Sequence, residues 1–460
     1  MTCLRKISIV LILFFFHLMV FAQKSATDFH KWAPTPPMGW NSWDCYGPTV
    51  TEAEVKANAD YMSQHLKHYG WQYIVVDIRW YVANDKAHGY NEKDPHYSID
   101  QFGRLLPAVS RFPSAANGKG FKALADYIHS EGLKFGIHVM RGIPVIAVKN
   151  NLPVKGSTAT AKDIYTDQGQ CAWLYDMYTI VAGKKGSQEY YNSIFQLYAS
   201  WGVDFVKVDD LTQPYHKQEV EMIRNAIDHC GRKIVLSTSP GETPIQDAEH
   251  IQQHANMWRT VGDFWDNWNQ LKDHFAVFER WNKWRSFGAY PDGDMLPLGH
   301  IGIRAERGNP RMTAFTKNEQ YTLMTLMAIF RSPLMFGGNL PDNDSFTLSL
   351  LTNKNVLQVL NNSKNNRQLF NKNNQVAWIA DDSKTSEKFL AVFNIADGET
   401  KEANIDIPLK EIGITNAKIT DLWTGKTVGT FSNTFSPEIK PHACGFYRLS
   451  IYTKKNKDGK

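Results

Sequence analysis

The 460-residue sequence has few cysteines and almost no excess of charge of either sign. Its five cysteines are widely spaced and include no CxxC pair, so neither a zinc site nor a disulfide framework is predicted. Lysine and arginine number 51 against 46 acidic residues, which is not the basic excess that a nucleic-acid-binding protein needs. We therefore expect no metal, no cofactor and no nucleic-acid partner.

The start of the chain has the composition of an export signal. Two basic residues precede an almost wholly apolar run over residues 7–21, and residues 20–22 (Val-Phe-Ala) have the form that a signal peptidase cleaves. The run is shorter than the roughly 20 residues that a membrane-spanning helix requires. Residues 1–22 are therefore predicted to be a signal peptide. The mature protein is expected to be periplasmic or secreted, without an integral membrane segment.

A chain of this length exceeds one compact core, and its pattern changes near residue 360. Over residues 33–345, short apolar runs alternate with amphipathic stretches, which is typical of the α/β fold called a (β/α)8 or TIM barrel. Residues 360–452 show short alternating runs between Asn, Asp, Gly and Lys turns, which predicts a small C-terminal antiparallel β-sandwich domain. Residues 453–460 form a charged tail.

Two aspartates, Asp209 and Asp263, stand where apolar runs of the predicted barrel end. Side-chain alternation puts Lys207 and Asp209 on one face of their strand, and a nearby ammonium favours an ionised carboxylate, so Asp209 is a better nucleophile candidate than Asp210. Catalytic groups of such barrels come from the ends of different strands, so the two carboxylates are expected to face each other, as glycoside hydrolysis requires. A Lys–Asp ion pair that only closes the barrel explains the first strand equally well.

Five motifs occur in order along the predicted barrel. They are PPMGWNSW at residues 36–43, KVD at 207–209, WRTVGD at 258–263, DNW at 266–268 and DGDML at 292–296. Together they resemble glycoside hydrolase family 27, the melibiase-type α-galactosidases. The resemblance extends from about residue 35 to about residue 340, and the predicted β domain agrees with the architecture of that family.

The resemblance implies a retaining mechanism with Asp209 as the nucleophile and Asp263 as the general acid/base. It implies no cofactor, and it implies a substrate that is a galactoside or a related oligosaccharide or polysaccharide. It also implies a sugar pocket lined by other side chains, with a histidine where the family commonly has tyrosine. The residues implied for the pocket are Trp40, Asp77, His138, Lys207, Arg259 and Asp294.

Three places depart from the family pattern where the sugar is recognised. Asp77 is followed by Ile78, whereas many α-galactosidases have two adjacent aspartates that hold the 4- and 6-hydroxyls of galactose. A β-L-arabinopyranoside has the ring stereochemistry of an α-D-galactopyranoside without the C6 hydroxymethyl group, so an apolar residue there suits a pentose. The loop at residues 237–242, which contains Ser239, lacks the Cys-Glu-Trp form common in the family, and Gly293 replaces a usual proline.

The sequence therefore predicts an exported retaining glycoside hydrolase, foremost an exo-acting α-galactosidase. A β-L-arabinopyranosidase and an α-glucan-cleaving relative are alternatives on the same fold. A non-catalytic carbohydrate-binding protein is an alternative of another class, but the retention of both Asp209 and Asp263 argues against it. Residues 141–190 lie where a loop over the pocket is expected, and they either set the leaving-group preference or form a simple surface excursion. The oligomeric state is left open.

Overall fold

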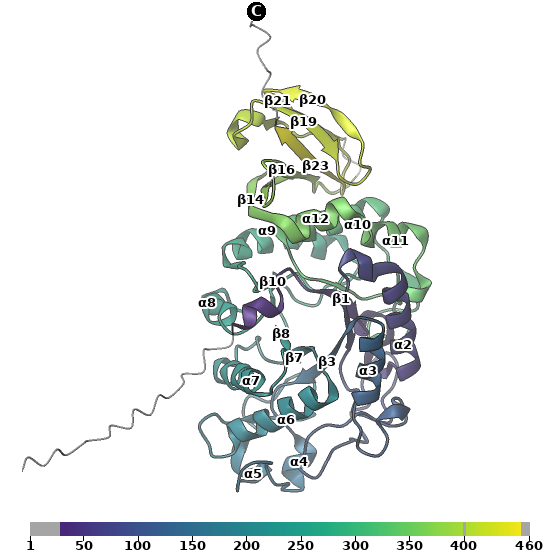
Figure 1. The fold of residues 1–460 in the computed structure, drawn as a ribbon, viewed down its shortest axis with the longest axis vertical. Coiled ribbons are helices and arrows are strands. Elements are labelled where there is room, and N and C mark those ends of the chain that lie inside the picture. Colours follow the sequence, from purple (N-terminus) through teal and green to yellow (C-terminus); the bar gives the residue numbers. More distant parts are fainter. Residues whose placement is uncertain (1–27, 399–401, 452–460) are drawn as a thin grey trace, which may run out of the picture.

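The computed structural model describes residues 28–398 and 402–451, which form two parts stacked along the long axis of the molecule (Figure 1). The predicted signal peptide at residues 1–22 and the charged tail at 453–460 lie outside these ranges. Within them, no helix has the length and apolar character needed to cross a membrane. The four cysteines that they contain are unbridged.

Eight parallel strands form the larger part, which confirms the predicted barrel. In chain order they are β1 (Met38–Asn41), β2 (Tyr73–Val76), β3 (Lys134–Met140), β7 (Phe205–Asp209), β8 (Val235–Thr238), β9 (Met257–Arg259), β10 (Tyr290–Asp292) and β13 (Leu334–Phe336). From β1 to β10 each strand pairs with the next in this series, and β13 pairs with β1, so that β10 and β13 are the two outer strands. A parallel bridge from Leu296, just after β10, to Phe336 links the two outer strands. The carboxyl ends of all eight strands therefore share one rim.

Helices on the outside of the barrel cover its strands (Figure 1). Capping boxes fix two of their starts, because Thr51 and Thr316 each exchange hydrogen bonds with a glutamate three residues further on. The main helices are α2 (Glu52–Tyr61), α3 (Lys122–Ser130), α6 (Ser187–Trp201), α7 (Lys217–His229), α8 (Ala248–Gln252), α9 (Trp268–Trp281), α10 (Lys317–Phe330), α11 (Ser345–Leu351) and α12 (Lys354–Asn362).

Between β3 and α6 the chain makes a long excursion of short elements. They are β4 (Ile143–Pro144), α4 (Val145–Lys149), α5 (Ala161–Ile164), β5 (Tyr165–Thr166) and β6 (Met177–Ile180), and the three strands pair in the order β4-β6-β5. Buried ion pairs join the excursion to the barrel: Arg79 Nε lies 2.9 Å from Asp176 Oδ2, and Arg141 Nη1 lies 2.9 Å from Glu219 Oε2. The excursion is thus an ordered part of the barrel rim.

The smaller part is antiparallel, as predicted for a β-sandwich. Its main sheet has the order β14-β15-β16-β23-β19-β20, and two short pairs, β17-β22 and β18-β21, pack on one face. The bounds are β14 (Ser363–Lys372), β15 (Gln375–Asp382), β16 (Lys388–Asn394), β17 (Ala403–Asn404), β18 (Ile407–Pro408), β19 (Asn416–Asp421), β20 (Thr427–Ser432), β21 (Thr434–Phe435), β22 (Glu438–Ile439) and β23 (Cys444–Ile451).

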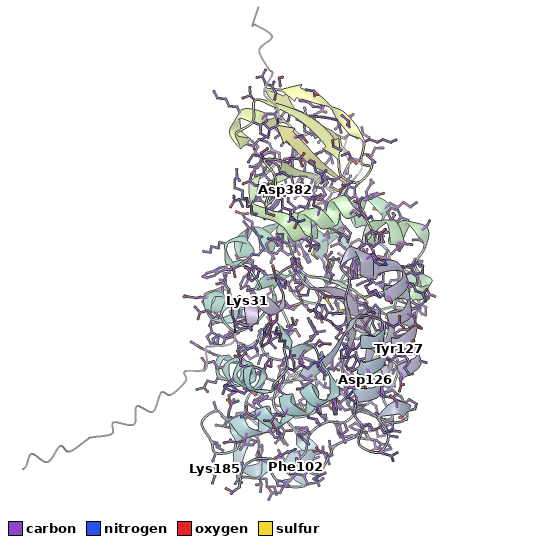
Figure 2. The ribbon with its side chains drawn as sticks, viewed as in Figure 1. Lys31, Phe102, Asp126, Tyr127, Lys185 and Asp382 are labelled. Atoms are coloured by element: carbon purple, nitrogen blue, oxygen red, sulfur yellow. The ribbon has the colours of Figure 1, made fainter. Side chains whose placement is uncertain are left out.

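The two faces of this sheet pack in opposite directions. Ile379 and Val392 belong to the core inside the sandwich, whereas their chain neighbours Trp378 and Phe393 belong to the core that continues into the barrel. Successive side chains of a strand point to opposite faces, so one strand serves both cores. Asp382, labelled at the junction in Figure 2, accepts a hydrogen bond from Gln358 Nε2 of α12 (3.1 Å).

Removal of the sandwich should therefore destabilise the barrel. A chain ending at residue 362 exposes Phe275 of α9, whose ring packs 4.9 Å from that of Phe393, and deprives Thr325 of the hydrogen bond from Trp423 Nε1 (2.9 Å). We expect the thermal midpoint to fall by more than about 5 °C. Calorimetry of the shortened and full chains checks this, and an unchanged midpoint in a folded barrel would show that the sandwich has no supporting role.

Candidate active site

A cavity of about 660 Å³ opens at the rim where the strands end. Side chains from the loops after β1, β2, β3, β7, β8, β9 and β10 line it, so residues far apart in the sequence meet there. Most of the predicted site residues are among them. Those that line the cavity are Asp77, Ile78, Lys207, Asp209, Arg259, Asp263 and Asp294.

Asp209, the last residue of β7, is held by hydrogen bonds to both carboxylate oxygens. His138 Nε2, from the neighbouring strand β3, lies 3.0 Å from Oδ2, and the Asp210 N–H donates to Oδ1 (2.9 Å). Burial opposes ionisation, but the hydrogen bond and charge of His138, with the charge of Lys207, outweigh it and hold the pKa of Asp209 well below its usual range. The carboxylate is therefore ionised at neutral pH, as a nucleophile must be.

An ion pair occupies the floor of the cavity. Lys207 Nζ lies 3.0 Å from Asp77 Oδ2, which also accepts a hydrogen bond from Asn41 Nδ2 (2.7 Å). Burial opposes the charge on Asp77, but Lys207, His138 and the hydrogen bonds that Asp77 accepts together outweigh it and lower the pKa of Asp77. Burial likewise opposes the charge on Lys207, but Asp77, Asp209 and Asp294 together raise its pKa. The floor thus offers a charged acceptor and a charged donor, which form the stronger hydrogen bonds to ligand hydroxyls.

Asp263 differs from Asp209 in its exposure. Its side chain is 55 % exposed, against 13 % for Asp209, and it lies in the loop after β9. Arg259 holds it with Nη2 at 3.1 Å from Oδ1, while Nη1 of the same guanidinium lies 2.8 Å from Asp294 Oδ1. Burial raises the pKa of Asp294 despite Arg259. A mostly covered carboxylate and an accessible one therefore share the cavity, the arrangement expected of a nucleophile and an acid that must reach a leaving group.

Trp40 does not line the cavity, contrary to the prediction. It is fully buried in the core between the strands and the outer helices, and its Nε1 donates to Gly338 O (2.8 Å). Alternation along β1 explains this, because the next residue, Asn41, points inward and contacts the site. Trp43, three residues further on in the same motif, supplies the tryptophan of the cavity wall.

His138 and Ser239 also lie behind the wall and do not line it. His138 is fully buried and reaches the site through its contact with Asp209. Ser239 is buried next to Pro240, which does line the cavity. His138 is thus placed to orient a carboxylate, and Ser239 to support the wall from behind.

The sequence did not predict several side chains that line the cavity. Trp43 is the last residue of the motif at residues 36–43, and Asp44 directly follows it, so this motif could have identified both. Asp44 is buried, and its Oδ2 has no hydrogen-bond partner among the residues that the structure describes. Burial together with the nearby Asp294 raises the pKa of Asp44 well above its usual range. Gly262 and Met295 belong to recognised motifs, and the others come from loops without a motif: Tyr90, Glu92, Trp173, Gln213, Pro240, Gly241, Phe264, Trp265, Glu306 and Arg307.

Family models match both parts of the chain. The model described as alpha galactosidase A matches residues 35–151 and 150–362, and the alpha galactosidase C-terminal beta sandwich domain matches residues 372–449. The chain belongs to glycoside hydrolase family 27, the melibiase-type α-galactosidases. The predicted family, fold and enzyme class are confirmed: this family 27 protein is a glycoside hydrolase.

The relatives of this family 27 enzyme are named for different glycosidase activities. It is 30 % identical to Alpha-galactosidase 2 of Arabidopsis thaliana, over 91 % of this chain and 90 % of the relative. It is 50 % identical to a β-L-arabinopyranosidase of Geobacillus stearothermophilus, with a TM-score of 0.90 over 93 % of this chain and 99 % of that one. A putative α-N-acetylgalactosaminidase of Bacillus halodurans is 49 % identical, with a TM-score of 0.83 over 92 % and 98 %.

Asp292, behind the cavity at the end of β10, should make stability depend on pH. Burial and the nearby Asp294 raise its pKa to about 7, although Arg259 opposes the shift. Because the folded-state pKa lies above the unfolded one, the stabilisation is complete below about pH 4 and is lost as the pH rises through about 7. Asp292→Asn cannot ionise and keeps an oxygen for the Asp294 N–H (3.0 Å). The thermal midpoint of Asp292→Asn should therefore change less between about pH 5 and about pH 8 than that of the wild type. An equal change in both proteins would show that Asp292 does not cause the pH dependence.

Proposed function

We propose that this family 27 enzyme is a retaining exo-glycosidase that prefers β-L-arabinopyranosides to α-D-galactopyranosides. The observation that carries the proposal is Ile78, which lines the cavity next to Asp77 and cannot hydrogen-bond a 6-hydroxyl. A buried apolar side chain at that point favours a ring without the hydroxymethyl group, because a hydroxyl placed against it would lose its hydrogen bonds to water. The 50 % identity to a β-L-arabinopyranosidase supports the same choice.

The proposed mechanism uses the two carboxylates in turn. Asp209 attacks the anomeric carbon, and Asp263 gives a proton to the departing oxygen, so a covalent glycosyl-enzyme ester forms. Asp263 then removes a proton from water, which attacks the ester and releases the sugar with its original anomeric configuration. The hydrogen bonds from His138 and from the Asp210 N–H keep the nucleophile in place for attack.

Recognition of the glycone follows from the floor of the cavity. Asp77 accepts from sugar hydroxyls and Lys207 donates to them, while Ile78 contacts the side of the ring that bears no substituent in a pentose. A side-by-side assay tests the proposal with nitrophenyl β-L-arabinopyranoside, nitrophenyl α-D-galactopyranoside and an isomaltosyl substrate. We expect the highest kcat/KM for the arabinopyranoside. A higher value for the galactoside or the isomaltosyl substrate contradicts the preference, and no turnover of any glycoside favours a binding protein.

Replacement of Ile78 by aspartate should reverse part of this preference. A carboxylate beside Asp77 offers a hydrogen bond to the 6-hydroxyl, and such a bond to a charged group contributes about 1.5 to 3 kcal/mol. The ratio of kcat/KM for the galactoside to that for the arabinopyranoside should rise about 10-fold or more. Ile78→Val, which stays apolar, is the control and should keep the wild-type ratio. An unchanged ratio in an Ile78→Asp variant with a wild-type melting temperature would show that Ile78 does not set the preference between the two glycones.

The enzyme is also proposed to act outside the cytoplasm. Support comes from the basic start, the apolar run over residues 7–21 and the cleavable residues 20–22. Fractionation of cells that express the full chain, with N-terminal sequencing of the product, tests this. We expect exported protein that begins at Gln23, and uncleaved protein in the cytoplasm would contradict export.

A further inference from the structure

Three aromatic side chains from three separate segments of the chain form a continuous wall along the cavity. The rings of Trp43 and Tyr90 stack with centroids 6.0 Å apart and planes inclined by 26°. The ring of Tyr90 in turn lies 6.5 Å from that of Trp173, inclined by 31°. Trp173 is 39 % exposed, so the wall runs from the interior of the cavity to its mouth.

The outer end of this wall lies where a leaving group would emerge. Asp77 and Asp44, at the bottom of the cavity, are buried, whereas the side chain of Asp263 is 55 % exposed. A general acid must contact the oxygen that joins the glycone to its leaving group. The leaving group therefore extends from the bottom of the cavity toward its mouth, where Trp173 also lies.

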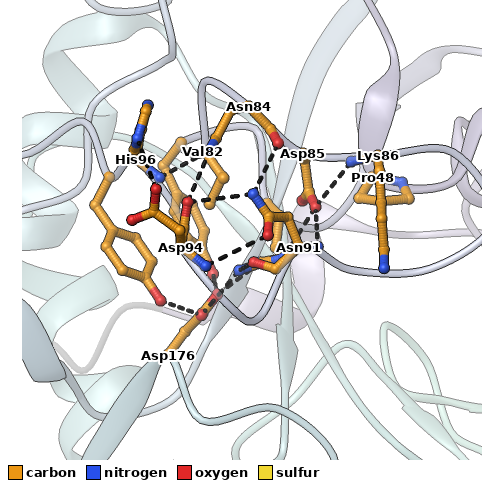
Figure 3. Close-up of polar contacts among 12 residues, drawn as sticks. Pro48, Val82, Asn84, Asp85, Lys86, Asn91, Asp94, His96 and Asp176 are labelled. Atoms are coloured by element: carbon orange, nitrogen blue, oxygen red, sulfur yellow. Dashed lines mark hydrogen bonds and ion pairs between the residues drawn. The ribbon is translucent and has the colours of Figure 1, made fainter.

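Two ion pairs of Arg79 hold the two outer rings in place, one within the loop that carries Tyr90 and one from that loop to the loop that carries Trp173. The Arg79 guanidinium lies 5.3 Å from the centre of the Tyr90 ring. The same side chain pairs with Asp85 (2.9 Å), in the loop that carries Tyr90, and with Asp176 (2.9 Å), three residues after Trp173. Figure 3 shows the polar contacts around Asp85 and Asp176. Rings fixed in this way lose little conformational entropy when a ligand stacks on them.

We propose that Tyr90 and Trp173 form a subsite for a pyranose residue of the leaving group, with Trp43 supporting them from inside. The apolar face of a pyranose ring matches a flat, exposed aromatic surface. The enzyme would then act on glycones attached to an oligosaccharide or polysaccharide in preference to those attached to a small alcohol. The excursion between β3 and α6, which carries Trp173, would thereby set the leaving-group preference. This inference rests on the proposed glycosidase function.

The test compares two substrates that share a glycone and differ in leaving group. One is the methyl glycoside and the other is a disaccharide in which the same glycone is attached to a second pyranose. Trp173→Ala should lower kcat/KM for the disaccharide about 3- to 10-fold more than kcat/KM for the methyl glycoside. Trp173→Phe should restore part of the loss. Tyr175→Ala is the matched control, because Tyr175 lies in the same loop, is 61 % exposed and does not line the cavity.

Equal losses on both substrates, or no loss on the disaccharide, would overturn the subsite. The comparison is made within one glycone, so it holds whether that glycone is arabinopyranose or galactose. If neither glycone is hydrolysed, the proposed function fails, and calorimetric binding of the disaccharide and of the free monosaccharide then tests the subsite separately. The subsite is supported if Trp173→Ala weakens binding of the disaccharide but not of the monosaccharide. It is refuted if the affinities for both ligands change equally.

Discussion

Asp209→Asn is expected to lower kcat by about 10³-fold or more on every glycoside that the enzyme hydrolyses. The amide keeps the size of the side chain and an oxygen for the Asp210 N–H, but it cannot form the glycosyl ester. The loss should therefore appear without unfolding. Kinetics measured with the melting temperature of the same variant check both parts.

Rescue by azide distinguishes a lost nucleophile from a disturbed site. In Asp209→Gly, a small anion can enter the space that the carboxylate leaves and attack the anomeric carbon in its place. The product should be a glycosyl azide of inverted configuration, since only one displacement then occurs. Wild-type rates in Asp209→Asn would exclude the assignment, and the absence of azide product in a folded Asp209→Gly variant would weigh against it.

Asp263→Ala should show a loss that depends on the leaving group. A natural sugar leaving group needs a proton as it departs, so kcat/KM should fall by about 10²- to 10⁴-fold. A nitrophenolate departs without one, so the first step on a nitrophenyl glycoside should be affected far less. Single-turnover measurements on both kinds of substrate separate this step from hydrolysis of the ester.

Asp273→Ala is the control for this second prediction. Asp273 is an exposed carboxylate on α9, ten residues further along the chain, and it does not line the cavity. Its loss should leave both rates unchanged. Equal losses on both leaving groups in Asp263→Ala would mean that Asp263 positions the substrate and does not protonate it.

Local patterns in the sequence predicted the barrel and its two carboxylates. Asp209 ends an apolar strand, and such strand ends meet at one rim of the barrel, so its place follows from the fold class alone. The sequence did not show which of the two tryptophans in the motif at residues 36–43 lines the cavity. Trp40 lies inside β1 and faces the helices, whereas Trp43 follows the strand and reaches the cavity, and only the observed end of β1 decides this.

The outer part of the site could not be predicted from the sequence. Tyr90 and Trp173 belong to loops without a motif, and they meet because Arg79 pairs with residues of both loops. Contacts of this kind join segments that are some 80 residues apart in the sequence. The hydrophobic periodicity of either segment predicts its secondary structure but not its contacts with the other. His138 was placed at the site by resemblance, but its hydrogen bond to Asp209 appears only when β3 and β7 are paired.

The configuration of the first sugar released tests the central claim most directly. Hydrolysis of nitrophenyl β-L-arabinopyranoside is followed by proton NMR within the first minutes, before the free sugar equilibrates between its anomers. Attack by Asp209 followed by attack of water predicts that β-L-arabinopyranose appears first and that the α anomer grows in later. Initial release of the α anomer, or no release of arabinose by the folded enzyme, would contradict the account.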